Sequence, residues 1–200
     1  GDITMSKVHI ALASYNYGYL LPELLDSLKA QTFQDFTVYV SYYGSTDNTL
    51  EVIQKYQKEM PLVINEYKDI VGVGPNLHDV VEFALKDNPD YIQILDCDDK
   101  VLPTFLEVSV ERMGKGDVDW CVCWGQLFGG RTGSVHAIIE PLDKLLLHNN
   151  LHSWAMFKAD VLRKHNYNPE LDYIIDWDLW IRLHLAGYKG EIIEQELHLR

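Results

Sequence analysis

Apolar and polar positions alternate in blocks along the first half of the chain. Four short runs rich in Val, Ile, Leu and Tyr predict buried β-strands, namely Lys7–Ser14, Phe36–Ser41, Leu62–Glu66 and Tyr91–Leu95. The segments between them carry apolar residues at helical spacing, so each pair of strands is separated by one predicted helix.

Three amphipathic patterns carry this prediction. Leu21, Leu24, Leu25 and Leu28 share one face of a helix at Leu20–Lys29, and Leu50, Ile53 and Tyr56 share a face of the next helix. Ser45, Thr46 and Asp47 are good N-cap types for that second helix. The third helix carries Leu77, Val80, Val81, Ala84 and Leu85. Strands that alternate with helices predict an α/β fold with a mostly parallel central sheet flanked by helices.

The second half is less regular. We expect helices at Pro103–Met113 and Asp176–Ala186 and strands at Trp120–Trp124 and Glu191–Leu199, whereas the pattern gives no prediction for residues 125–150. No repeat, linker or shift in composition marks a boundary. We therefore expect one domain over residues 5–200, with a nucleotide-binding half at 5–100 and an acceptor half at 101–200. Residues 1–4, ahead of Met5, read as an artificial extension.

Composition narrows the possible functions. The 200 residues are 47% hydrophobic, enough for a substantial core, and 17 Lys and Arg against 30 Asp and Glu give a net charge of −13. Nucleic-acid binding needs clustered Lys and Arg, so we expect no nucleic-acid partner. No apolar run reaches the roughly 18 residues of a membrane span, so we expect no integral membrane segment. Three cysteines make no disulfide framework and favour a cytoplasmic protein.

Polar clusters follow three of the predicted strands. They are Tyr15-Asn16, Tyr42–Asp47 and Asp96–Asp99. In parallel α/β sheets, ligands bind outside the carboxyl ends of the strands. These three clusters are therefore the expected ligand site.

The acidic cluster carries the strongest chemical signal. Asp96, Asp98 and Asp99 place three carboxylates within four residues, and such charges repel unless a cation neutralises them. Carboxylate oxygens suit Mg²⁺ or Mn²⁺, which in turn bridges phosphates. The alternative is that Asp98 or Asp99 caps the following helix, but a cap needs only one aspartate.

Five segments, in this order, resemble the family 2 glycosyltransferases of GT-A fold. They are Ala13–Asn16, Leu28–Thr32, Gly44–Thr49, Leu95–Asp99 and Asp176–Leu183, and the resemblance runs from about Val8 to Leu199. It implies an enzyme that moves a sugar, with inversion, from a nucleotide-diphosphate sugar to a hydroxyl of a glycan or lipid-linked acceptor. Such acceptors occur in polysaccharide, lipopolysaccharide or glycoprotein assembly, and a lipid acceptor would place the enzyme at the membrane periphery.

The resemblance also implies a role for each matching residue. Ser14, Tyr15 and Asn16 would cradle the nucleotide, with Tyr42 beside the base. Asp96, Cys97 and Asp98 would bind ribose and diphosphate, and Asp98 and Asp99 would hold Mn²⁺ or Mg²⁺. Asp176 would act as general base, since single displacement needs one group to take the acceptor proton. His198 is a candidate third metal ligand, because family members often continue past this strand with a segment that contributes a histidine to the metal–diphosphate site; the alternative is a surface or packed residue of the strand.

The chain departs from the family pattern in two places. Tyr42-Tyr43 stands where the family carries paired aspartates, and tyrosine cannot supply a carboxylate acceptor for the base. Ile175 precedes Asp176 where an acidic residue is usual. The chain also ends directly after His198, so a C-terminal truncation of the catalytic domain is an expectation.

Two other function classes compete with the enzyme. A non-catalytic GT-A domain that binds a sugar nucleotide or a partner protein would explain Tyr42-Tyr43. A nucleotidyltransferase would use the same carboxylates, but no Gly-rich basic loop for a triphosphate lies near Tyr15–Tyr19.

The remaining motifs favour structural roles. Cys121 and Cys123 share one face of a strand and predict buried free thiols, and His148 with His152 predicts a polar loop rather than a metal site. Gly72-x-Gly74 predicts a flexible turn, and Asp178 with Arg182 an ion pair on a helix. Trp154 and Trp177 are either core residues or walls for an acceptor sugar.

Overall fold

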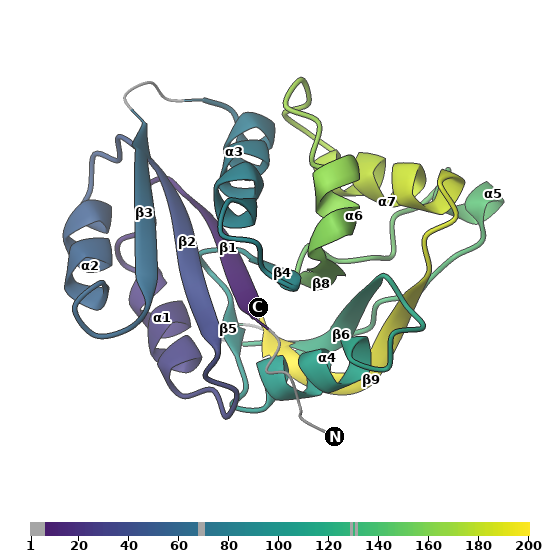
Figure 1. The fold of residues 1–200 in the computed structure, drawn as a ribbon, viewed down its shortest axis with the longest axis horizontal. Coiled ribbons are helices and arrows are strands. Elements are labelled where there is room, and N and C mark those ends of the chain that lie inside the picture. Colours follow the sequence, from purple (N-terminus) through teal and green to yellow (C-terminus); the bar gives the residue numbers. More distant parts are fainter. Residues whose placement is uncertain (1–6, 68–70, 129, 131) are drawn as a thin grey trace.

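One sheet runs through the whole molecule (Figure 1). The computed structural model describes residues 7–67, 71–128, 130 and 132–200. Within them, the strand order is β3-β2-β1-β4-β8-β6-β9-β5, with β7 paired to β6. The strands are β1 (Val8–Ser14), β2 (Phe36–Tyr43), β3 (Leu62–Tyr67), β4 (Tyr91–Leu95), β5 (Lys100–Val101), β6 (Trp120–Leu127), β7 (Gly133–Val135), β8 (Ala155–Lys158) and β9 (Gly190–Leu199).

Helices cover this sheet. They are α1 (Leu21–Lys29), α2 (Thr49–Tyr56), α3 (Val73–Leu85), α4 (Phe105–Met113), α5 (Leu142–Leu145), α6 (Ala159–Lys164) and α7 (Ile175–Leu185). The longest described helix, α3, has 13 residues, and no described helix has the length and apolar character to cross a bilayer. The predicted α/β fold is confirmed.

Strands β3, β2, β1 and β4 pair only in parallel with one another. Ser14 lies opposite Tyr42, and Leu12 lies opposite Leu95. The carboxyl ends of β1, β2 and β4 therefore meet at one edge, as the sequence predicts. The parallel ladders are the longest in the sheet, and Val8, Ile10, Ala11 and Leu12 of β1 are fully buried.

The second half of the sheet is mixed. β4 pairs antiparallel with β8, and β8 pairs antiparallel with β6, which pairs parallel with β9. The sequence pattern did not predict five short elements, namely β5, β7, α5, β8 and α6. Each has six residues or fewer and, unlike the equally short β3 and β4, none belongs to the regular alternation of strands and helices that supports an assignment.

Two local predictions need correction. Helix α2 begins at Thr49 with Asn48 as its N-cap, and Asp47 instead accepts a hydrogen bond from the Thr49 N–H at 3.0 Å. Gly72-x-Gly74 is not a flexible turn. Gly72 is the N-cap of α3 and Gly74 lies in its first turn, where a Cβ would stand 1.8 Å from the Leu171 carbonyl oxygen. These glycines therefore allow close packing.

Candidate functional site

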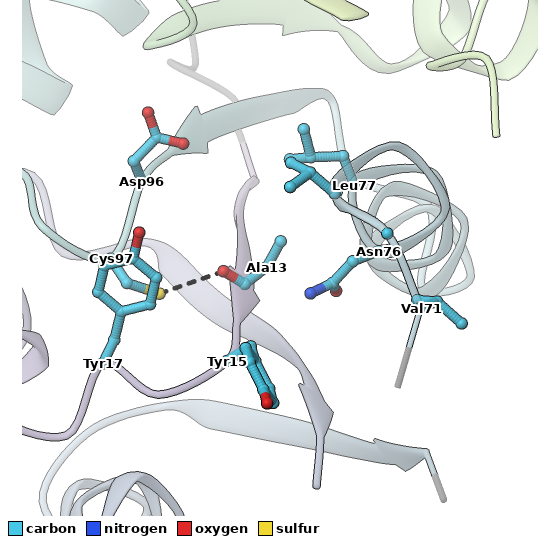
Figure 2. Close-up of a pocket in the computed structure, with 10 residues that line it drawn as sticks. Ala13, Tyr15, Tyr17, Val71, Asn76, Leu77, Asp96 and Cys97 are labelled. Atoms are coloured by element: carbon cyan, nitrogen blue, oxygen red, sulfur yellow. Dashed lines mark hydrogen bonds between the residues drawn. The ribbon is translucent and has the colours of Figure 1, made fainter. Parts of the chain in front are cut away.

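A pocket of about 260 Å³ opens at the carboxyl ends of β1 and β4 (Figure 2). Its lining comes from the loop after β1, the start of α3 and the turn after β4. These residues are Ala13, Tyr15, Tyr17, Val71, Gly72, Val73, Asn76, Leu77, Asp96 and Cys97. Of the predicted nucleotide-binding residues, Tyr15, Asp96 and Cys97 face this pocket.

The loop after β1 is held in place by the loop after β2. Asn16 adopts a left-handed conformation with φ of 58°, which asparagine tolerates better than most residues. Its N–H donates to Ser45 Oγ at 2.9 Å, and its Oδ1 accepts from the Thr46 N–H at 2.8 Å. Asn16 and the buried Ser14 lie outside the pocket lining. Asn16 thus positions the loop that carries Tyr15 and Tyr17.

Both tyrosines at the end of β2 are buried outside the pocket lining. The Tyr42 hydroxyl donates to the Ser45 carbonyl at 3.3 Å, and the Tyr43 hydroxyl donates to Asp79 on α3. Tyr43 also stacks on Tyr67, with ring centroids 4.4 Å apart. The polar lining opposite Tyr15 comes instead from Asn76, whose Oδ1 accepts a hydrogen bond from Ser41.

The turn after β4 gathers the three predicted carboxylates. Asp99 Oδ2 accepts the Asp96 N–H at 2.8 Å, and the Asp99 N–H donates to the Asp96 carbonyl at 3.1 Å. The helix-cap alternative is wrong, because β5 follows directly and α4 has Thr104 as its N-cap. Carboxylate oxygens of Asp96, Asp98 and Asp99 lie within 4.8 Å of one another.

His198 approaches this cluster from β9. Its Nε2 lies 3.0 Å from Asp99 Oδ1, and both side chains are fully buried. Neither His198 Nε2 nor Asp99 Oδ1 has a hydrogen-bond partner, so each atom is available to bind a metal ion. Burial, followed by the charges of Asp99 and Asp176, raises the pKa of Asp96 to about 7. Unsatisfied carboxylate and imidazole atoms around crowded acids fit a divalent cation.

Aromatic rings support His198. Its imidazole stacks on Trp154 with centroids 3.8 Å apart, and Trp154 stacks on His152 at 4.3 Å. Trp154 is buried and donates to the Cys123 carbonyl at 3.0 Å, so it is a core residue rather than an acceptor wall. Burial, aided by Arg200 and His198, lowers the pKa of His152 to about 4, which keeps this ring neutral.

Asp176 lies in the first turn of α7 and is half-buried. Its Oδ1 has no hydrogen-bond partner, and burial raises the pKa of this carboxyl to about 6. A group of that pKa can accept a proton near neutral pH. The neighbouring Asp178 bonds Arg182 at 2.8 Å, so this predicted ion pair is confirmed, and Trp177 donates to the Leu145 carbonyl.

Sequence reasoning missed the α3 side of the pocket. Val73, Asn76 and Leu77 line it, as do Val71, Gly72 and, from the first loop, Tyr17. Leu77 was predicted only as a core residue, and Asn76 gave no signal beyond its place next to that apolar stripe. The predicted free thiols Cys121 and Cys123 are confirmed as buried, unpaired residues of β6.

Comparison with known proteins shows the family of the chain. Residues 9–175 match the family described as Glycosyl transferase family 2. An uncharacterized glycosyltransferase, MJ1057 of Methanocaldococcus jannaschii, is 29% identical, over 98% of this chain and 71% of that protein.

Two solved structures share the fold. TarS residues 1–349 of S. aureus, in complex with UDP, has a TM-score of 0.81 at 19% identity, over 97% of this chain and 60% of that one. The mannosyltransferase PcManGT of Pyrobaculum calidifontis, with GDP-Man and Mn²⁺, has a TM-score of 0.76 at 16% identity, over 99% of this chain and 57% of that one. This chain is a glycosyltransferase domain of the GT-A fold, and it belongs to glycosyl transferase family 2.

Proposed function

We propose that this domain transfers a sugar, with inversion, from a nucleotide-diphosphate sugar to a hydroxyl group of a glycan or lipid-linked acceptor. The observation that carries this proposal is the double position of Asp96. It lines the pocket after β1 and also belongs to the carboxylate cluster after β4. A nucleotide in that pocket would therefore direct its diphosphate to the carboxylates.

The base and ribose would occupy the pocket. Tyr15 is 38% exposed there and offers an aromatic face for stacking. Because Asn76 Oδ1 accepts from Ser41, its amide nitrogen is free to donate to a carbonyl of the base, and in Figure 2 it points toward Ala13. The proposed donor site thus contacts the base through Asn76 of α3, instead of through the aspartate that the family carries at the position of Tyr42-Tyr43.

Asp98, Asp99 and His198 would hold Mn²⁺ or Mg²⁺, with Asp96 beside them. Such a cation, when bound, offsets the negative charge that develops on the departing diphosphate. Asp176 accepts the proton of the attacking acceptor hydroxyl, so no covalent sugar–enzyme intermediate is needed. Its partnerless Oδ1 is the atom available for this proton.

Calorimetric titration tests the donor site. We expect one of UDP, GDP, CDP and dTDP to bind in the presence of Mn²⁺, and Asp98→Ala to weaken that binding by about tenfold or more. If none of the four binds, the proposed donor site is wrong.

A second experiment tests the base. Asp176→Asn should retain nucleotide binding within about threefold and lose transfer by at least about 100-fold, since a general base contributes on that scale. Retained transfer in this variant would remove Asp176 from the mechanism.

A further inference from the structure

The segment 166–172, between α6 and α7, packs against the start of α3, and none of its residues lines the pocket. In Figure 1 it belongs to the light green loop beside the upper end of α3. We propose that this segment couples donor binding at α3 to the placement of Asp176, and that Gly74 is the positioning residue for that contact. This inference rests on the proposed function.

Gly74 brings the two backbones together. A Cβ at this position would lie 1.8 Å from the Leu171 carbonyl oxygen and 3.2 Å from that of Asn168. Real Cβ atoms do not approach other atoms so closely, so only glycine fits here. At Gly72 a Cβ would lie 1.8 Å from the Asp172 carboxylate, but this exposed side chain can move aside, so the requirement for glycine is specific to Gly74.

Hydrogen bonds extend the contact along α3. His78 Nδ1 donates to the Tyr167 carbonyl at 2.8 Å, and Asn166 Nδ2 donates to the His78 carbonyl at 3.1 Å. Asn166 Nδ2 also lies 3.0 Å from Glu82 Oε1. The segment is thus fixed to the first three turns of α3.

The same segment is fixed to α7. Arg182 donates to the Asn166 carbonyl at 3.0 Å while it pairs with Asp178 at 2.8 Å. Ile174, which immediately precedes α7, has φ of 52°, a strained conformation for a β-branched residue. Asp176 follows two residues later, so a shift of the segment would move its carboxylate.

A nucleotide in the pocket and the segment would therefore contact the same short stretch of backbone at the start of α3. Val71, Gly72, Val73 and Asn76 face the pocket, whereas the buried Gly74 faces Leu171. Energetic coupling between sites linked in this way commonly amounts to a 5- to 150-fold effect, about 1–3 kcal/mol. Donor binding would thus fix Asp176 before the acceptor arrives.

Hydrogen exchange on the wild-type protein gives the first test. The probe is whichever of UDP, GDP, CDP and dTDP binds with Mn²⁺. We expect it to slow exchange in residues 166–172, none of which lines the pocket. Protection confined to residues 71–77 and 96–99 would overturn the coupling and leave the proposed function intact. Failure of all four nucleotides to bind would overturn both.

Gly74→Ala gives the second test. Its Cβ must displace the Leu171 backbone, so we expect kcat for transfer to fall at least about tenfold. Nucleotide affinity and donor KM should change less than about threefold, and the protection of residues 166–172 should disappear. Gly114→Ala is the matched control, because this helix-end Cβ also meets a backbone carbonyl, Val110 O at 3.2 Å, on α4. It should leave kcat unchanged.

Asn166→Ala is a second variant that tests the proposal even if Gly74→Ala does not fold. It removes two hydrogen bonds to α3 without adding an atom. We expect the same separation of effects, with kcat lowered and donor KM retained. Unchanged kcat in both variants would contradict the proposal.

Discussion

Among single residues, Asp176 is the one whose ionisation should set the pH dependence of sugar transfer. Burial raises the pKa of its carboxyl to about 6, so the base is ionised above that pH and protonated below it. We expect kcat/KM for transfer to rise with pH through an apparent pKa of about 6. A pH–rate profile at saturating metal checks this, and a profile already flat at pH 5 would contradict it.

The raised pKa of Asp176 also affects the stability of the fold, which falls as this carboxyl ionises. The folded state holds the proton more tightly than the unfolded chain, whose aspartate has a pKa of 3.8, so this contribution to stability is complete below pH 3.8 and is lost as the pH rises to about 6. Asp176→Asn should therefore raise the free energy of unfolding by about 3 kcal/mol at pH 7.5 and have almost no effect at about pH 3. Urea unfolding at the two pH values measures the difference.

Ile174 stores strain at an exposed position. Its side chain is 65% exposed, so little apolar burial compensates for its φ of 52°. Asparagine adopts this conformation more readily, and Ile174→Asn should raise the free energy of unfolding by about 1 kcal/mol. In a thermal melt this corresponds to about 2–4 °C. Ile138→Asn, at a residue 50% exposed with ordinary φ, is the control and should give no gain.

At the scale of elements, β9 depends on a glycine at its start. A Cβ on Gly190 would lie 2.0 Å from Trp120 Cζ2, and the Trp120 indole is itself buried. Gly190→Ala should therefore destabilise the protein by about 1–3 kcal/mol. Gly130→Ala, where a Cβ meets nothing within 4 Å, should leave the denaturation midpoint unchanged. Equal denaturation midpoints for both variants would contradict this prediction, and would show that the packing around Trp120 adjusts to the added methyl group.

Elements that belong to the regular alternation of strands and helices were predictable, and the short elements outside it were not. The strands β1 to β4 are rich in apolar residues and alternate with helices, and α3 has a full amphipathic face, so the sequence alone places them. β8 has four residues, and its identity as a strand comes only from its neighbours β4 and β6. Propensity cannot encode a partner that lies some 60 residues away along the chain.

The residues of the site can likewise be divided into those that the sequence predicts and those that it does not. The acidic turn after β4 and Tyr15 follow strands, so the rule for parallel sheets predicts their place. The role of Asn76 depends on how α3 docks on the sheet, and the contact between Gly74 and Leu171 depends on a loop 97 residues further along. Chemistry that is local in sequence could be predicted, whereas contacts made by tertiary packing could not.

At the scale of the whole molecule, one sheet and one apolar core join the two halves. β4 of the first half pairs with β8 of the second, and the core contains residues from both. We therefore expect the chain to unfold in a single cooperative transition.

The chain provides its own probes for this measurement. All five tryptophans lie between Trp120 and Trp180, so their fluorescence reports the second half only. Far-UV circular dichroism reports both halves. Coincident urea midpoints are expected, and a separate tryptophan transition would reveal two independent units.

The burial of the thiols has a practical consequence for labelling. All three cysteines of the chain are buried, and burial raises the pKa of Cys121 and of Cys123 to about 12 and that of Cys97 above its usual range. Maleimide dyes react with thiolates on accessible side chains, so the native protein presents almost no background. A cysteine introduced at Tyr173, which is 83% exposed, becomes a single attachment point three residues from Asp176. Movement of the loop ahead of α7 can then be followed by fluorescence or spin-label distances in an otherwise unmodified enzyme.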